Sequence, residues 1–436
     1  MTTSKTLLRK LLSSISSNPS NNIQVDGNPL PRATGTFVQQ DMTSNWGDSN
    51  WQSEFTYMKE AGMDILVFLP CSITRGDTTH TIYPTDLAGF NTENNALDRV
   101  DICLRNAQKA GVKVFLGIQY NDDWWTKAPS DENWFFKQME ISNQVADELY
   151  RKYHHKYPKS FHGWYWVYEV SNANFRTERD YILLSKAINI NLKFLKQNKM
   201  RLPILLSPFM NGTFSSPKRY ADNWATFFKH TDLEKGDIFC PQDSVGAGWL
   251  KMSSLDTWFA ALKKATSVKP ELSFWANVEN FDHSDWSSAT LDRFIEQMRI
   301  ESRYVDNIIT FSYNHYYSPN NIDPGLHHTY LNYLKTGVLD SEKPSPPTDV
   351  NAKKLPGDKY EITWKPATDN IGLYGYHLYR NGKLIFTTKA QRIYGTSKKG
   401  PETHYIDDLI LNRRKPAYEV KAFDFAGNIS NGSMTN

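Results

Sequence analysis

Short apolar runs alternate with amphipathic stretches from Ala33 to about Leu339. The apolar runs have the length and composition of buried strands, and they are Thr34–Gln39, Ile65–Pro70, Lys113–Gln119, Gly163–Val170, Ile204–Pro208, Asp237–Pro241, Leu272–Val278 and Asn307–Tyr313. Between them, apolar residues recur at i, i+3 and i+4, which predicts helices over Trp51–Ala61, Ala96–Ala110, Trp134–Tyr157, Arg179–Gln197, Ser254–Ala265 and Ala289–Arg303. Gly62 and Gly111 follow two of these helices as stop signals.

Eight strand-helix units in this order predict an α/β fold, a closed parallel (β/α)8 TIM barrel. The alternative is an open, doubly wound sheet. Sheets of that kind that bind nucleotides carry a Gly-rich phosphate loop after a strand, and no strand here is followed by one. The pattern therefore favours the barrel.

The pattern changes near Leu339. Residues 341–348 are polar and Pro-rich, which is typical of a semi-rigid linker. Alternating strands then follow at Tyr360–Trp364, Tyr374–Tyr379 and Tyr418–Ala422, and Asn381-Gly382 signals a hairpin. We therefore divide the chain into an N-terminal extension (1–32), the barrel (33–339), a linker (340–348) and a small all-β, immunoglobulin-like sandwich (349–436).

Composition narrows the class of protein. Of the 436 residues, 39% are hydrophobic and 22% charged, enough for two packed cores. The net charge of +3 is small and dispersed, so we expect no nucleic-acid partner. Three sparse cysteines predict neither disulfides nor a metal site. No apolar run is long enough to span a membrane, and residues 1–17 make a poor secretory signal, which leaves open a trimmed signal or a cytoplasmic protein.

Aromatic residues are unusually frequent, with 13 Trp, 23 Tyr and 23 Phe. Sugar rings have apolar C–H faces that stack on exposed aromatic rings. Trp124, Trp249 and Trp275 are the candidate stacking platforms. An aromatic-rich core is the alternative explanation, and only the positions of the rings distinguish the two.

Polar and aromatic residues close the predicted strands. In (β/α)8 barrels the working residues lie at these carboxyl ends, on one face of the barrel. The residues that this rule selects as candidate substrate contacts are Gln39, Gln119, Tyr120, Asn172, Asp243, Tyr313, Asn314 and His315.

Glu169 and Glu279 are the two candidate catalytic residues. Each closes an apolar strand, where an unpaired carboxylate carries a desolvation cost. Glycoside hydrolysis needs two such groups, one to protonate the leaving oxygen and one to attack the anomeric carbon or activate water. The structural alternative is that each is ion-paired at the barrel mouth. Two carboxyl groups and water complete this reaction, so we expect no cofactor and no metal.

Asp243 lies in a loop with Gly246 and Gly248. It is a candidate for binding a sugar hydroxyl or orienting Glu279, and it is also open to a catalytic role. The histidines lack metal-ligand spacing, and only His315 is kept as a sugar contact.

The region 344–436 resembles bacterial fibronectin type III modules. The resemblance rests on Ile362-Thr363-Trp364, on the run from Gly375 to Gly382 and on the run from Ala422 to Asn428. Such modules accompany secreted polysaccharide-degrading enzymes, so the resemblance implies a secreted or cell-surface protein. The sandwich has no aromatic platform of its own, which favours a spacer role.

The barrel resembles glycoside hydrolase clan A, and most closely a bacterial glycosidase-like family of unknown function. The resemblance to that family covers about 33–334 and rests on the runs Gly35–Gln39, Gln242–Gly246 and Phe311–Asn314, with Tyr317-Ser318-Pro319. It implies that Glu169 is the acid/base and Glu279 the nucleophile. The Asn that precedes the acid/base in clan A is replaced by Tyr168, and Asn172 follows three residues later.

The sequence thus predicts a glycoside hydrolase that acts on a poly- or oligosaccharide by a retaining mechanism. Two alternatives stay open, a non-catalytic carbohydrate-binding barrel and an inverting hydrolase that uses Asp243. The sugar, the linkage, endo or exo action and the oligomeric state do not follow from the sequence.

Overall fold

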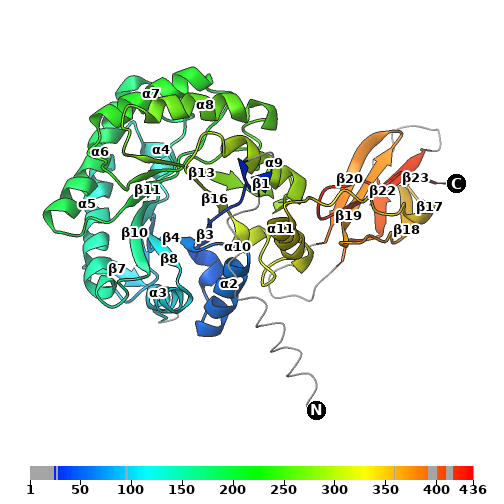
Figure 1. The fold of residues 1–436 in the computed structure, drawn as a ribbon, viewed down its shortest axis with the longest axis horizontal. Helices are drawn as coiled ribbons and strands as arrows, with labels where there is room; N and C mark the ends of the chain where they lie inside the picture. The colour runs from blue at the N-terminus through cyan, green and yellow to red at the C-terminus, as the bar shows by residue number, and fades with distance from the viewer. Residues whose placement is uncertain are drawn as a thin grey trace, which may run out of the picture.

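A closed parallel barrel forms the larger part of the molecule (Figure 1). The computed structural model describes residues 24–25, 28–93, 97–357, 359–390, 400–408 and 416–435, so most of the predicted N-terminal extension lies outside the described residues. The barrel strands are β3 (Gly35–Gln39), β4 (Ile65–Leu69), β8 (Lys113–Gly117), β10 (Phe161–Trp166), β11 (Ile204–Leu206), β12 (Ile238–Phe239), β13 (Ser273–Glu279) and β16 (Asn307–Phe311). They pair in chain order around the barrel, which confirms the predicted fold.

Helices surround the barrel, and the main ones are α2 (Asp48–Glu60), α3 (Arg99–Ala110), α5 (Glu132–Leu149), α6 (Glu178–Gln197), α7 (Pro217–His230), α8 (Leu255–Thr266), α9 (Leu291–Glu301) and α11 (Pro324–Thr336). The two predicted stop signals are confirmed, since Gly62 and Gly111 both have positive φ. The predicted helix over Trp134–Tyr157 is α5 followed by a π-helical turn, η2 (Tyr150–His154). Shorter helices are η1 (Gln40–Thr43), α4 (Trp124–Lys127), η3 (Met252–Ser254) and α10 (Tyr313–Tyr316).

The third predicted strand is interrupted. β8 ends at Gly117, and β9 (Gln119–Asn121) leaves the barrel to pair with β5 (Ser72–Arg75). With β6 (Thr78–Thr81) and β7 (Phe90–Thr92) these strands form a separate four-stranded sheet. Two-stranded ribbons are β1 (Gln24–Val25) with β2 (Asn28–Pro29), and β14 (Phe281–Asp282) with β15 (Ser287–Ser288).

Much of the aromatic excess lies in the core. Trp51, Trp124, Trp164 and Trp224 are fully buried, and Trp224 contacts five other aromatic rings at centroid distances of 4.7–6.1 Å. The core alternative therefore accounts for a large share of the aromatic residues, and sugar contacts must be sought among the exposed rings.

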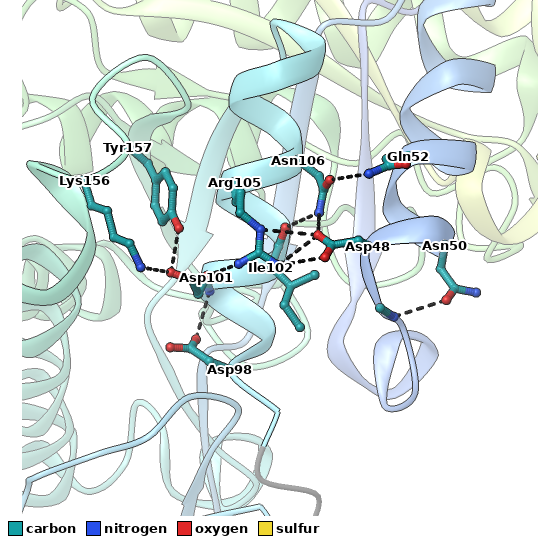
Figure 2. A network of polar contacts seen from close by, with 11 residues as sticks. Asp48, Asn50, Gln52, Asp98, Asp101, Ile102, Arg105, Asn106, Lys156 and Tyr157 are labelled. Carbon is teal, nitrogen blue, oxygen red and sulfur yellow. Dashed lines mark hydrogen bonds and ion pairs between the residues drawn. The ribbon is translucent and has the colours of Figure 1, made fainter.

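A polar network joins α2, α3 and the segment after η2 (Figure 2). Asp48 accepts hydrogen bonds from Arg105 at 2.8 Å and Asn106 at 2.6 Å. Asp101 in turn accepts from Tyr157 at 2.6 Å and pairs with Arg105 and Lys156. Asp48 and Asp101 are each paired with a cation, so these contacts stabilise the packing of α2 and α3.

Residues beyond the linker form an all-β sandwich. One sheet contains β17 (Thr348–Leu355), β18 (Lys359–Lys365) and β21 (His404–Asp407), and the other contains β19 (Leu373–Arg380), β20 (Lys383–Lys389), β22 (Tyr418–Asp424) and β23 (Ser433–Met434). The predicted hairpin is confirmed, because Asn381 and Gly382, both with positive φ, connect β19 to β20. The sandwich lies beside α9 and α11 (Figure 1).

Within the part of the chain that the structure describes, no helix is long and apolar enough to cross a membrane. Cys71, Cys103 and Cys240 are buried free thiols.

Candidate active site

A cavity of about 560 Å³ opens at the carboxyl ends of the barrel strands. Both predicted catalytic residues line it, together with three amide side chains and many aromatic rings. The lining residues are Phe37, Gln39, Leu69, Trp125, Tyr165, Glu169, Phe209, Gln242, Ala247, Trp249, Asn277, Glu279, Phe281, Trp286, Phe311 and Tyr316. Two carboxyl groups thus share one aromatic cavity.

Glu279 is the last residue of β13, and its side chain is buried. One carboxylate oxygen, Oε2, accepts a hydrogen bond of 2.6 Å from the Ala247 backbone N–H. Ala247 belongs to the loop after β12, which reaches Glu279 closely because residue 246 is glycine. A Cβ at Gly246 would lie 2.8 Å from the Glu279 Cβ. The loop therefore holds one carboxylate oxygen of Glu279 in place.

Glu169 lies three residues beyond the end of β10. Its Oε1 accepts a hydrogen bond of 3.0 Å from Gln242 Nε2, which also donates to the Ser207 carbonyl at 3.1 Å. The backbone carbonyl of Glu169 accepts from the indole N–H of Trp124 at 2.9 Å. These contacts fix both the backbone and the side chain of Glu169.

Burial raises the pKa of both carboxyl groups. For Glu279 the negative charges of Asp243 and Glu169 raise the pKa further, whereas the Ala247 amide and Arg293 act in the opposite direction. The Gln242 hydrogen bond opposes the rise for Glu169. The Glu169 charge adds to the rise for Glu279, so ionisation of Glu169 disfavours ionisation of Glu279.

Asp243 lies behind Glu279 and does not line the cavity. It accepts hydrogen bonds from the Val245 backbone N–H at 3.0 Å and from Gln297 Nε2, and Gln297 also donates to the Glu279 carbonyl at 3.0 Å. Glu301 of α9 is fully buried as well, and burial and the Asp243 charge raise its pKa. Asp243 is thus linked to Glu279 through Gln297 and lies outside the cavity lining.

Three exposed indole rings surround the cavity. Trp125, Trp249 and Trp286 are 42%, 51% and 67% exposed, and they come from α4, from the loop after β12 and from the hairpin after β13. Phe281 stacks on Trp286 at a centroid distance of 5.6 Å and on Tyr316 at 5.4 Å, with interplanar angles of 11° and 24°. This stack forms one wall of the cavity, and Trp125 contacts Phe209 on another.

Among the predicted residues, Gln39, Trp249, Glu169 and Glu279 line the cavity. Trp124 does not, because it is fully buried beneath Tyr168 and Phe175, and its neighbour Trp125 lines the cavity instead. Trp275 is four residues before Glu279 on β13, partly buried against the core and outside the cavity.

Gln119, Tyr120 and Asn172 also lie outside the cavity lining. Gln119 is buried and accepts a hydrogen bond of 2.7 Å from Tyr168. The pKa of Tyr120 is raised to about 12 by burial and by the Glu169 charge, so Tyr120 lies near the site without lining it. Asn172 joins two loops through the backbone of Asn211.

The predicted contacts after β16, Tyr313, Asn314 and His315, are not in the cavity lining. The hydroxyl group of Tyr313 is hydrogen-bonded to His327 at 2.8 Å, and Asn314 donates to the buried Glu54 at 2.5 Å. His315 contacts Phe311 and Tyr316, and burial lowers its pKa to about 4. Tyr316, the next residue, lines the cavity.

Sequence reasoning did not select the hairpin residues Phe281 and Trp286 or the loop residue Phe209. Each of them lies two or more residues beyond the end of a barrel strand. A rule that selects the residues closing each strand therefore does not include them. A search for aromatic residues two to eight positions beyond each strand would have found them.

None of the residues that line the cavity is Lys, Arg or His. No group of three or more potential metal ligands occurs within the described ranges either. The site therefore presents carboxyl groups, amides and aromatic faces, a set that suits a neutral polyhydroxylated ligand.

These features define a (β/α)8-barrel protein with a paired-carboxyl, aromatic-lined cavity. The family described as "Domain of unknown function (DUF4434)" matches residues 33–323, and the chain belongs to this family. A solved structure described as a "putative alpha-L-fucosidase" from Bacteroides thetaiotaomicron VPI-5482 is similar to this chain with a TM-score of 0.56 and 24% identity, covering 72% of this chain and 99% of its own. That likeness establishes the fold.

Curated relatives are similar over short segments. An alpha-amylase from Niallia circulans is 36% identical over 93 residues, which is 21% of this chain and 6% of the amylase. Chitinase Chi52 from Paenibacillus xylanexedens is 31% identical over 101 residues, which is 23% of this chain and 17% of the chitinase. The chain therefore spans less than a fifth of the length of either relative.

Proposed function

We propose that the protein is a glycoside hydrolase that cleaves neutral poly- or oligosaccharides with retention of configuration. The observation that carries the proposal is that Glu169 and Glu279 line one aromatic cavity without a neutralising cation in its lining. The names of the curated relatives, an amylase and a chitinase, agree with a carbohydrate substrate.

In this mechanism the Glu169 carboxyl group donates its proton to the glycosidic oxygen while the Glu279 carboxylate attacks the anomeric carbon. The glycosidic bond breaks and a glycosyl ester forms on Glu279. Water then attacks the same carbon, Glu169 takes the proton from it, and the ester bond breaks to release the sugar. The Ala247 amide and Arg293 support the ionised form of Glu279 that the first step requires.

The neutral character of the substrate follows from charge. An anionic sugar in this cavity would face two carboxyl groups with no lining cation, which is unfavourable at low dielectric. Gln39, Gln242 and Asn277 offer amide groups for hydroxyls, and Asn277 Oδ1 is buried in the cavity wall without a hydrogen-bond partner.

The test is turnover on a panel of glucan, mannan, chitin and fucoside oligosaccharides by wild type and by Glu279→Gln. We expect the variant to lose at least about 10³-fold in kcat while still binding the substrate. Glu271→Gln, an exposed glutamate just before β13 at the opposite end of the barrel, is the matched control and should keep full activity. A wild type that binds a sugar without cleaving it would favour the non-catalytic binding protein.

Retention is tested by following the anomeric protons of the first product by NMR. Initial formation of the substrate's own anomer supports the ester intermediate, and initial formation of the opposite anomer supports an inverting reaction. Because Asp243 does not line the cavity, we propose that it positions Glu279 in either case.

We also propose a secreted or cell-surface location, which the sandwich's resemblance to fibronectin type III modules supports. Fractionation of the native host with an antibody to the protein tests it. Recovery from the cytosolic fraction alone would contradict it.

A further inference from the structure

The hairpin of β14 and β15 forms one side of the cavity. It follows Glu279 directly and carries Phe281 and Trp286, which stack on each other in the aromatic wall. Trp286 has a φ of 53°, a left-handed conformation that is unfavourable for a residue with a large side chain. Such a conformation persists only where neighbouring contacts hold it.

Those contacts come from the sandwich. Lys389, at the end of β20, donates to Asp285 at 2.9 Å and to the Ser287 hydroxyl, on the two sides of Trp286. The Lys389 side chain is only 12% exposed. Tyr374, fully buried on β19, donates its hydroxyl to the Ser288 carbonyl at 2.8 Å. Two side chains of the sandwich therefore form hydrogen bonds with the hairpin next to Trp286.

The sandwich also supplies acceptors to the start of α9. The backbone N–H groups of Leu291 and Asp292 donate to the carbonyls of Phe425 and Ala426, each at 3.0 Å. Thr290, the residue at the N-cap position, makes no side-chain cap of its own. Two of the open amides of the first turn are thus satisfied by the other domain.

α9 connects this interface to the carboxyl pair. Its Gln297 reaches both Asp243 and the Glu279 carbonyl, and its Arg293 donates to the Phe281 carbonyl. The hairpin itself is bound to the loop after β12, because the His283 N–H donates to the Gly246 carbonyl at 2.9 Å. The sandwich is therefore connected to Glu279 and to the aromatic wall in two ways, through α9 and through the hairpin.

We propose that the sandwich is a structural part of the active site, in which Lys389 is a positioning residue that holds the Trp286 hairpin in its ligand-binding conformation. The sugar-binding part of this proposal rests on the proposed function. The sandwich is accordingly not a spacer, and a change at its edge alters ligand affinity in the barrel.

Hydrogen–deuterium exchange tests the support of the hairpin without any ligand. Lys389→Met keeps the apolar stem and removes the charge, and we expect exchange in peptides over 281–288 to become about tenfold faster. Lys389→Arg keeps the charge and should largely restore protection. Lys365→Met is the matched control, since Lys365 pairs with Asp349 on the sandwich surface. Unchanged exchange in Lys389→Met would overturn the proposal.

Steady-state kinetics test the expected change in ligand affinity. The substrate is the panel oligosaccharide that the wild type cleaves. We expect Lys389→Met to raise KM about tenfold, equivalent to about 1.4 kcal/mol of binding, with kcat changed less than twofold. Faster exchange with an unchanged KM would show that the hairpin does not serve the site and would overturn the proposal. If the wild type cleaves no sugar, the proposed function fails, and the exchange experiment still decides whether the sandwich holds the hairpin.

Discussion

Four carboxyl groups lie within one part of the barrel, at the cavity or behind it. Burial raises the pKa of Glu169, Glu279, Asp243 and Glu301, and for Glu279 and Glu301 the negative charges of neighbouring carboxyl groups raise the pKa further. Glu169 and Glu279 line the cavity, whereas Asp243 and Glu301 lie behind it. The Asp243 charge therefore influences the ionisation of Glu279 from outside the cavity.

Replacing Asp243 tests this tuning. The Asp243 charge raises the pKa of Glu279, so Asp243→Asn should lower that pKa. The acidic limb of the kcat/KM profile, which reports ionisation of the nucleophile, should move to lower pH. If Asp243 had only a structural role, replacing it would lower kcat/KM at every pH and would not move the acidic limb of the profile. A full pH profile of both proteins makes the comparison.

Glu54 on α2 is a second buried carboxyl group, with a structural role. Asn314, Ser318 and Asn320 donate to it from the chain after β16, at 2.5–2.9 Å. Burial nevertheless raises its pKa from the ordinary 4.5 to about 7.

Stability should depend on pH through Glu54. A raised folded-state pKa means that the folded protein binds more protons than the unfolded chain between about 4.5 and 7. The contribution of Glu54 to stability is complete below its pKa in the unfolded chain, about 4.5, and is lost as the pH rises through about 7. Relative to Glu54→Gln, the wild type should lose roughly 3 kcal/mol of unfolding free energy between pH 4.5 and 8. Urea denaturation at several pH values measures this, and parallel curves for the two proteins would contradict it.

Residue-level prediction from the sequence succeeded where the geometry of the fold decides the position. Glu169 and Glu279 were found because strand ends in a barrel converge on one face. Trp124 and Trp125 could not be told apart, since they are adjacent on the short helix α4 and its packing decides which ring is buried. Asn314 was selected by the same strand-end rule and instead binds Glu54, a partner 260 residues away in sequence.

At the scale of elements, the alternation of apolar runs was sufficient to predict all eight barrel strands. The hairpin of β14 and β15 was not predicted, because strands of two residues have no periodicity to detect. α7 and α11, which both begin at a proline, were not among the helices selected from the sequence. The fourth strand was predicted to extend to Val170, but β10 ends at Trp166. The apolar run of the sequence continues beyond the last residue that pairs with a neighbouring strand.

The loop after β12 is the element that holds Glu279, and Gly246 allows its close approach. A Cβ at residue 246 would lie 2.6 Å from the Phe281 carbonyl and 3.1 Å from the Glu279 Oε2. Gly246→Ala should therefore displace the Glu279 carboxylate and lower kcat about 100-fold, since misplacement by about 1 Å has an effect of that size. Steady-state kinetics with a thermal melt measure both activity and folding.

Gly47→Ala is the control for this substitution, because a Cβ there meets nothing within 4 Å. It should leave kcat unchanged. Full activity in Gly246→Ala would show that the loop after β12 moves easily. Its contact with the Glu279 carboxylate would then not determine the position of Glu279.

At the scale of the whole molecule, the interface between the domains decides how the protein behaves. The lack of an aromatic platform on the sandwich favoured a spacer role, but the sandwich shares an apolar cluster with the barrel core through Tyr374, Ala390, Phe423 and Phe425. The sandwich keeps a second cluster of its own around Ile362 and Leu378. Sequence patterns describe each domain separately, so contacts that bury residues of both could not be read from them.

Shared burial predicts that the two domains unfold together. Differential scanning calorimetry of the wild type should show one transition whose calorimetric and van't Hoff enthalpies agree. Phe425 is 4% exposed and stacks on Tyr374 at 5.3 Å, so Phe425→Ala should remove about 3–5 kcal/mol of packing across the interface and separate the transition into two. Phe386→Ala, which removes a ring that stacks on Tyr405 within the sandwich, should lower the transition temperature without splitting it. Two transitions in the wild type would mean that the interface is too weak to couple the domains, and the sandwich could then not hold the Trp286 hairpin as firmly as its contacts indicate.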